Sequence, residues 1–236
     1  MDNGSELYSG TTAVAHRVLL AYFYPVKHKQ TFLIGIAGGS GSGKTSFLRE
    51  LMNHFTADDV ALVSQDNYYE PKEKQHVDEN GQHNFDMPTS INRTHFHDDM
   101  MRLINGNSIE KLEYNFNNPA WEPQPIVVRP APVIVMEGLF VFHYAAIRAQ
   151  LCYKVFLDAH HETRLQRRLQ RDEVERGYPA HEVLYQWNQH VRPAEMAYLE
   201  PYREECDLIV MNDDHFEDGL ETLVNHIQKS LHLTVG

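Results

Sequence analysis

A glycine-rich segment near the start of the chain has the residue types needed to hold the phosphates of a nucleotide. Residues 38–45 read Gly-Gly-Ser-Gly-Ser-Gly-Lys-Thr and fit the pattern GxxxxGK(S/T). Glycines let the backbone curve around phosphates with its N–H groups pointing inward, and a following helix adds the positive end of its dipole. We expect Lys44 to reach the β- and γ-phosphates and the Thr45 hydroxyl to bind Mg²⁺.

The predicted cofactor site covers this whole segment and the residue after it. Its members are Gly38, Gly39, Ser40, Gly41, Ser42, Gly43, Lys44, Thr45 and Ser46. The alternative is a flexible Gly/Ser loop without a ligand. The segment lies between an apolar run and an amphipathic helical pattern, which is the setting that a phosphate-binding loop requires, so the nucleotide site is favoured.

Two carboxylates follow other apolar runs and are candidates for metal binding and catalysis. Glu137 comes directly after the run Val133–Met136, and Asp66 follows Val60–Ser64 by two residues. Ligands of open parallel sheets bind outside the carboxyl ends of the strands. We therefore expect Glu137 to bind Mg²⁺, directly or through water, and Asp66 to orient an acceptor hydroxyl and take its proton. The alternatives are an ordinary loop acid for Glu137 and a helix cap or turn residue for Asp66.

Five arginines lie within thirteen positions of a chain whose net charge is -12. They are Arg164, Arg167, Arg168, Arg171 and Arg176. The first, third and fourth share one face of a helix at the spacing i, i+4, i+7. Such a row of guanidinium groups suits phosphate oxygens and can stabilise the charge of a moving phosphoryl group. The alternative is a solvated helix whose arginines pair with Asp172, Glu173 and Glu175.

Apolar runs and amphipathic patterns predict the elements that position these residues. Continuous apolar runs, which buried parallel strands require, occur at Thr31–Ala37, Val60–Ser64, Val133–Met136, Tyr153–Leu157 and Leu208–Met211. Helical patterns start at about Lys44 and cover about 93–104, 161–176, 180–200 and a last segment that includes Leu220 and Ile227. Strands that alternate with helices predict an α/β fold whose parallel sheet is covered on both faces.

The remaining segments predict smaller features and the domain limits. Two short extended pieces, at about 110–116 and 125–129, are expected to form a hairpin within about 110–130, and Asn80-Gly81 marks a turn in the polar loop 67–90. We expect one domain at 31–236, with a helical lid at about 161–180. Residues 1–30 read as an N-terminal extension with a short helix at about 14–22.

Composition excludes several classes of protein. The negative charge argues against nucleic acid as a partner, and no stretch approaches the ~20 apolar residues of a membrane span. The two cysteines, Cys152 and Cys206, lack metal-ligand spacing, and a reduced cytoplasmic setting is expected. The fifteen histidines do not share a helical face at i, i+4 spacing, which favours surface or core positions over metal binding.

Several further motifs resemble, in the same order, those of the uridine kinases. Residues 65–69, Gln-Asp-Asn-Tyr-Tyr, resemble their Asp-Ser-Phe-Tyr segment, and residues 84–88, Asn-Phe-Asp-Met-Pro, resemble Asn-Phe-Asp-His-Pro. Glu137-Gly138 resembles Phe-Glu-Gly, and residues 163–177 resemble an arginine-rich lid. The resemblance covers about residues 31–228. It implies the phosphoribulokinase/uridine kinase family and its P-loop NTPase fold, with a small β-hairpin and a helical lid.

The resemblance implies a role for each matching residue. Asp66 would be the catalytic base for the 5′-hydroxyl of a pyrimidine nucleoside, and Lys44, Arg171 and Arg176 would act on the phosphates. The expected acceptor-binding residues are Asp86, Arg168 and Gln186 at the ribose hydroxyls, Tyr114 at the base, and Tyr69. The resemblance also implies ATP or GTP as the donor, Mg²⁺ as the metal, with Thr45 and Glu137 as its protein partners, and a homo-oligomer.

The chain departs from the family pattern on the acceptor side. Pro119 stands where the uridine kinases have a base-reading His, and Tyr178 stands where they have the last Arg of Arg-Gly-Arg. Met87 replaces the His of Asp-His-Pro, and Trp121 is either a stacking residue or, as we favour, part of the hairpin core. Lost polar partners change selectivity strongly, so a different small hydroxyl acceptor is the second hypothesis. The third is a nucleotide-binding regulator without catalysis, which the presence of Lys44, Thr45, Asp66 and Glu137 disfavours.

Overall fold

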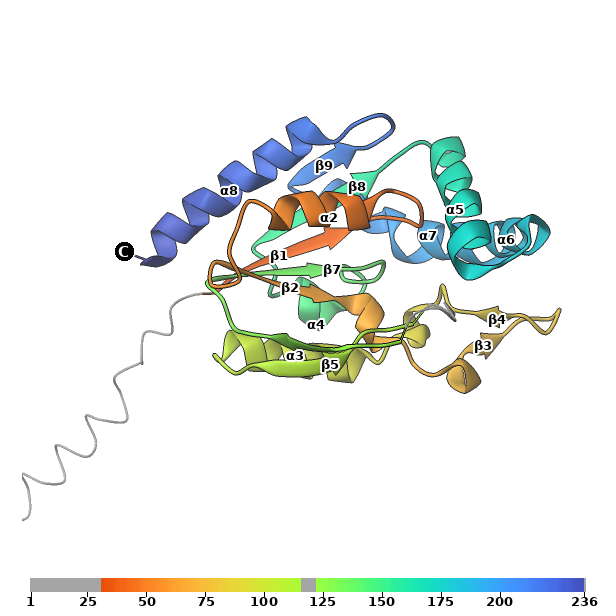
Figure 1. Ribbon diagram of the computed structural model, residues 1–236, viewed down its shortest axis with the longest axis horizontal. Coiled ribbons are helices and arrows are strands. Elements are labelled where there is room, and N and C mark those ends of the chain that lie inside the picture. Colours follow the sequence, from red (N-terminus) through yellow and green to blue (C-terminus); the bar gives the residue numbers. More distant parts are fainter. Residues whose placement is uncertain (1–30, 116–121, 236) are drawn as a thin grey trace, which may run out of the picture. The chain divides into compact units, whose positions relative to one another are not determined.

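Five strands form one parallel sheet, as the apolar runs predict (Figure 1). A computed structural model describes residues 31–115 and 122–235 of the chain. The strands, in their order across the sheet, are β2 (Val60–Ser64), β7 (Val133–Glu137), β1 (Phe32–Ala37), β8 (Tyr153–Asp158) and β9 (Leu208–Met211). All four adjacent pairs are parallel, which confirms the predicted α/β class.

The strand order brings the predicted site residues to one edge of the sheet. Strand β1 is central, and its two neighbours, β7 and β8, follow it only after long crossovers. Ile36 pairs with Glu137, and Ser64 pairs with the same residue from the other side. The carboxyl ends of β1, β2 and β7 therefore lie side by side, and this is where a sheet of this kind binds its ligands.

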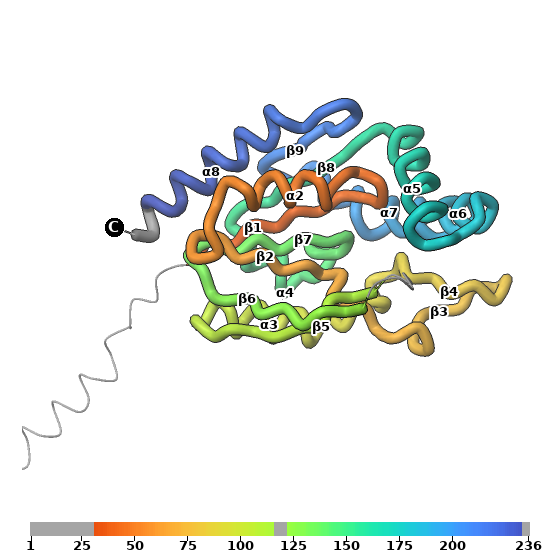
Figure 2. The backbone as a smooth tube through the Cα atoms, in the orientation of Figure 1, coloured from red at the N-terminus to blue at the C-terminus, as the bar shows by residue number. Residues whose placement is uncertain are grey.

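Helices cover both faces of the sheet (Figures 1 and 2). Helices α2 (Lys44–Met52) and α8 (Glu217–Val235) pack on one face, in a core that includes Ile36, Phe47 and Leu223 with no solvent exposure. Helices α3 (Arg93–Ile104) and α4 (Ala145–Arg148) cover the other face, with Phe96 and Ile147 in its core. Each fully buried side chain of this size contributes roughly 1.5–3 kcal/mol to the free energy of unfolding. The two cores therefore stabilise the sheet whose edge carries the site.

The predicted hairpin is present beside α3. Strands β5 (Ile109–Leu112) and β6 (Pro125–Val128) pair in antiparallel register, and β6 then leads into β7. Residues 116–121 lie outside the described part of the chain, so the predictions for Pro119 and Trp121 remain predictions. The same holds for the helix expected at 14–22 and for the division into an extension and a kinase domain. In residues 31–115 and 122–235, no helix has the length and apolar character needed to cross a bilayer.

The two long helical segments predicted within residues 161–200 are both present. Helix α5 (His161–Arg176) has the expected limits and ends at Gly177, whose φ of 69° suits glycine. The helix predicted for about 180–200 is present, and it consists of α6 (Ala180–Gln186), the π-helical turn Trp187–Val191 and α7 (Arg192–Tyr198) with no loop between them. Pro193 accounts for the π-helical turn, since it has no N–H to donate and its ring would collide with the carbonyl four residues earlier in a regular α-helix.

A second hairpin in the loop 67–90 is fastened to this π-helical turn. Strands β3 (His76–Val77) and β4 (His83–Asn84) flank the predicted turn, where Gly81 has a φ of 78°. The Asp78 carboxylate accepts hydrogen bonds from the Tyr185 hydroxyl and from Nε2 of the buried His190, both at 2.7 Å. The segment that carries Asn84 and Asp86 is thereby held against the base of the lid.

The docking of α8 onto the sheet predicts a pH-dependent stability. His226 stacks on Tyr153 with 3.9 Å between ring centroids, and burial lowers its pKa below the ordinary 6.5; nearby Asp207 opposes this shift and Lys229 adds to it. The unfolded chain therefore binds more protons, and the stability from neutral His226 is lost as pH falls through this range. Urea unfolding at about pH 7.5 and about pH 5 should show a smaller loss in His226→Phe than in the parent protein. An equal loss in both would contradict the assignment.

Candidate active site

The glycine-rich segment forms a tight loop between β1 and α2. Gly41 and Gly43 have φ angles of 77° and 92°, a region that other residues rarely adopt. The Lys44 ammonium donates to the carbonyl of Gly38 at 2.7 Å and lies 3.4 Å from that of Gly39. Thr45 and Ser46 are exposed at the first turn of α2. The loop therefore has the backbone geometry that the motif predicts.

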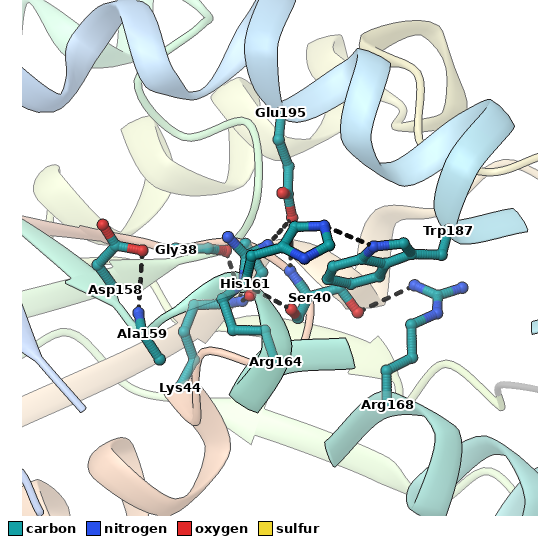
Figure 3. Close-up of polar contacts among 11 residues, drawn as sticks. Gly38, Ser40, Lys44, Asp158, Ala159, His161, Arg164, Arg168, Trp187 and Glu195 are labelled. Atoms are coloured by element: carbon teal, nitrogen blue, oxygen red, sulfur yellow. Dashed lines mark hydrogen bonds and ion pairs between the residues drawn. The ribbon is translucent and has the colours of Figure 1, made fainter. Parts of the chain in front are cut away.

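Side chains from distant elements hold the other polar groups of this loop (Figure 3). The Ser40 N–H donates to Glu195 Oε1 at 3.0 Å, and Arg164 Nε donates to the Ser40 carbonyl at 3.1 Å. Asn212, just after β9, donates to the Ser42 carbonyl at 2.8 Å. A Cβ atom on Gly39 would overlap with Arg164 and Glu195, so glycine is required there by close packing.

Arg164 lies on the same face of α5 as Arg168, as its helical spacing predicts, since both contact Ser40 of the loop. Arg164 also forms a buried ion pair with Glu195. Glu195 was not predicted, because its partners lie 31 and 155 residues away and no local pattern links them. Trp187 Nε1 donates to His161 Nε2 at 2.9 Å and ties the lid to the same region.

Lys44, Asp66 and Glu137 form one electrostatic group at the edge of the sheet. Glu137 is 8% exposed and accepts a 2.5 Å hydrogen bond from the Ser64 hydroxyl. Burial, and next the Asp66 charge, raise the pKa of Glu137 to about 7, while Lys44 and Ser64 oppose that rise. Burial also raises the pKa of Asp66, against the opposing charges of Lys44, Arg176 and Arg171. Both acids thus lie where an added cation would be stabilised.

The donor atoms at this edge fit magnesium. Mg²⁺ prefers oxygen ligands and is commonly held by one or two protein oxygens together with substrate phosphates. Glu137 and the Thr45 hydroxyl supply such oxygens. In the part of the chain that the structure describes, no three His, Cys, Asp or Glu side chains converge into a dedicated metal cluster. A metal that depends on the phosphates of a nucleotide is consistent with this arrangement.

Asp66 is positioned by the short 3₁₀ helix Gln65–Tyr68 at the end of β2. Its N–H donates to the Ser64 hydroxyl at 3.3 Å, so that hydroxyl caps the turn and also bonds Glu137. Gln65 is buried, and its Oε1 accepts from the Phe140 N–H at 2.8 Å, which fixes the turn to the chain after β7. The helix-cap alternative for Asp66 does not hold, because Ser64 is the cap.

The predicted acceptor residues gather beside Asp66. The rings of Tyr69 and Tyr114 are 5.0 Å apart at 38°, and the Tyr114 N–H donates to Asn67 Oδ1 at 2.9 Å. Burial raises the pKa of Asp86 against the nearby charge of Arg168. Burial, and then Tyr178 and Asp66, raise the pKa of Tyr114. The departure at Tyr178 therefore lies next to a predicted base-pocket residue.

Arg168 connects the two sides of the site. Its Nη1 donates to the Ser40 hydroxyl at 2.9 Å, and its Nη2 donates to Gln186 Oε1 at 3.0 Å. Arg168 is 7% exposed and therefore not solvated as the alternative expects, but it pairs with Asp172 as that alternative predicts. Arg167 faces elsewhere and donates to the carbonyls of Asn212 and Asp213, both at 2.8 Å.

Comparisons with known proteins identify the family of the chain. The sequence profile of the Phosphoribulokinase / Uridine kinase family matches residues 33–214. A uridine kinase of Clostridium botulinum (strain Kyoto / Type A2) is 32% identical over 203 residues, which cover 86% of this chain and 98% of that protein. The chain belongs to the Phosphoribulokinase / Uridine kinase family and is therefore a kinase.

Solved structures show the same fold at low sequence identity. A possible uridine kinase from Bacillus stearothermophilus superposes with a TM-score of 0.54 at 14% identity, over 83% of this chain and 96% of that one. The D-glycerate 3-kinase from Cryptococcus neoformans var. grubii superposes with a TM-score of 0.56 at 13% identity, over 86% and 94%. The predicted P-loop kinase fold is confirmed.

The Glu195 contact predicts a measurable role in nucleotide binding. Glu195→Gln retains an oxygen for the Ser40 N–H but leaves Arg164 buried without its anion, which typically costs about 3–5 kcal/mol. We expect a lower melting temperature and an ATP affinity reduced on the order of tenfold, because the loop loses one support. Isothermal titration with ATP measures this, and Glu204→Gln, an exposed site with the same charge change, is the control. Unchanged ATP affinity in a less stable variant would mean that the ion pair stabilises the fold alone.

Proposed function

We propose that the protein transfers the γ-phosphate of ATP or GTP to the 5′-hydroxyl of a pyrimidine nucleoside. The products are the nucleoside 5′-monophosphate and the nucleoside diphosphate. The observation that carries this proposal is the approach of Asp66, beside the aromatic pair Tyr69 and Tyr114, to Lys44 of the phosphate-binding loop. Curated relatives of similar length that bear the name uridine kinase support the nucleoside acceptor.

In this proposal the loop and the lid arginines hold the donor. The N–H groups of the loop and Lys44 bind the β- and γ-phosphates, and Arg171 and Arg176 offset charge as the phosphoryl group moves. Thr45 and Glu137 would hold Mg²⁺, which would neutralise charge on the phosphates. Ser64 orients the Glu137 carboxylate for that contact.

The acceptor hydroxyl is oriented by Asp66. Burial raises the pKa of Asp66 above the ordinary 3.8, which makes it a better proton acceptor than a solvated carboxylate. Asp86, Arg168 and Gln186 would bind the ribose hydroxyls, and the rings of Tyr69 and Tyr114 offer apolar faces for a base. Because phosphoryl transfer has a loose transition state, the proton leaves late, and Asp66 both orients the hydroxyl and accepts its proton.

A second candidate keeps the chemistry and changes the acceptor to another small hydroxyl compound. Its specific support is Tyr178, which lies near Tyr114 and provides one hydroxyl in place of a guanidinium group. Met87, in place of a histidine, provides no strong hydrogen-bond donor or acceptor for recognising the acceptor molecule. A site that lacks such groups discriminates less strongly against other acceptors.

A substrate panel separates these two candidates. Initial rates with Mg²⁺ and either ATP or GTP should be measured on nucleosides, pantothenate, glycerate and sugar phosphates. We expect uridine or cytidine to have the highest kcat/KM, because the aromatic pair and Asp86 suit a nucleoside. A higher kcat/KM for a non-nucleoside acceptor would support the second candidate instead, and chelation of Mg²⁺ should abolish turnover in either case.

Replacement of Asp66 tests catalysis directly. Asp66→Asn retains the shape of the side chain but removes the proton acceptor, so kcat should fall about 10²–10⁴-fold. Affinity for ATP should change little, because Asp66 serves the acceptor side. Steady-state kinetics and ATP titration measure the two effects. Unchanged turnover would exclude Asp66 as the base, and a parent protein that binds ATP without consuming it with any acceptor would indicate a regulator.

A further inference from the structure

One buried carboxylate gathers three of the lid arginines. Asp172, on α5, is 1% exposed. Its Oδ1 lies 2.8 Å from Arg171 Nε and 3.2 Å from Arg176 Nη1, and its Oδ2 lies 3.2 Å from Arg168 Nε. Residues 168, 172 and 176 repeat every four positions and so lie on one face of the helix. Glu173 and Glu175 are exposed, so the burial is specific to Asp172.

A single anion cannot neutralise three cations. Repulsion from Arg171 and Arg168 contributes, after burial, to a lowered pKa of Arg176, and Asp172 opposes this shift. Without Asp172, three guanidinium groups would face one another in a poorly solvated place, and they would separate. With it, they stay together, and Asp66 and Asp86 lie close enough to act on the same arginines. Guanidinium groups held in one place can bind several oxygens of a polyanion such as a triphosphate.

Asp172 leaves the terminal nitrogens of Arg168 and Arg171 available for other partners. It contacts Arg168 and Arg171 through Nε, the nitrogen nearest the aliphatic chain. In Arg168 the two terminal nitrogens reach onward to Ser40 and Gln186. The Asp172 carbonyl accepts the N–H groups of Gly177 and Tyr178, which fixes the turn just after Arg176. Side chain and backbone of one residue thus set the end of the lid helix.

We propose that Asp172 is a positioning residue that sets Arg168, Arg171 and Arg176 in place for the transferred phosphoryl group. The proposal rests on the phosphotransfer proposed above and specifies how its cations are arranged. Asp172 acts through the arginines and does not itself contact the substrates. The other two arginines of the lid are held separately, Arg164 by Glu195 and Arg167 by two carbonyls.

The experiment is a double-mutant cycle between Asp172 and its partners. Asp172→Asn places an amide N–H against guanidinium N–H groups, so kcat with uridine should fall on the order of ten- to a hundredfold. Arg171→Gln should cause a comparable fall. The double variant should lose much less than the product of the two, because both changes disrupt the same arrangement. Multiplicative losses, or an Asp172→Asn variant with unchanged kcat and KM, would overturn the proposal.

Two further measurements separate positioning from folding. Glu173→Gln is the matched control, with the same charge change at an exposed neighbour, and its kinetics should stay within about twofold of the parent. If Asp172→Asn alone fails to fold, the double variant Asp172→Asn/Arg171→Gln removes one cation with the anion and should fold with greater stability than the single variant. A double variant that folds and has full activity would refute positioning.

Titration with a non-hydrolysable ATP analogue tests the proposal without any acceptor. The Asp172 and Arg171 variants should bind the analogue more weakly than the parent, and their losses should again be non-multiplicative. If uridine and cytidine are not phosphorylated by the parent protein, the proposed function fails, and this titration still decides the role of Asp172. The proposed role of Asp172 would be refuted if every variant bound the analogue as tightly as the parent. If the parent phosphorylates an acceptor, the variants would also have to show unchanged turnover.

Discussion

The active edge of this kinase depends on how a buried backbone loop satisfies its polar groups. A loop that offers its N–H groups to phosphates still has carbonyls and a remaining N–H that need partners, and each buried group without one costs about 1–3 kcal/mol. At Ser40 the N–H, the carbonyl and the hydroxyl are bonded by Glu195, Arg164 and Arg168. The shape of the loop is therefore set by α5 and α7, which follow it by more than a hundred residues.

The same edge concentrates buried charge in an acidic protein. Arg164 pairs with Glu195, and Asp172 collects three more arginines, so the lid contains few charges without a neighbour of opposite sign. Asp66 and Glu137 differ, because burial outweighs the nearby cations and raises the pKa of both. Buried acids with raised pKa values are typical of places where proton transfer or cation binding occurs.

The features predicted from sequence were those carried by local spacing. The glycine-rich loop, the strands and the position of Asp66 after β2 each follow from a few consecutive residues. Glu195 was missed because its partner Ser40 lies 155 residues away. Arg164 lies on the predicted face of α5, but its ion pair with Glu195 of α7 could not be read from local spacing. The π-helical turn at Trp187–Val191 was missed because an amphipathic pattern continues through such a turn.

The supports of the donor and acceptor sides meet at Arg168. It donates to the Ser40 hydroxyl of the glycine-rich loop and to Gln186, and its Nε lies 3.2 Å from the Asp172 carboxylate. The Tyr178 side chain takes no part in these contacts with Arg168. Its N–H donates to the Asp172 carbonyl, and its side chain lies near Tyr114, where it adds to the rise that burial causes in the pKa of that residue. A change at position 178 can therefore alter the shape and polarity of the acceptor pocket and leave the phosphate-binding groups in place. This separation explains how a chain can depart from its family at residues proposed to contact the acceptor and still retain the residues proposed for phosphoryl transfer.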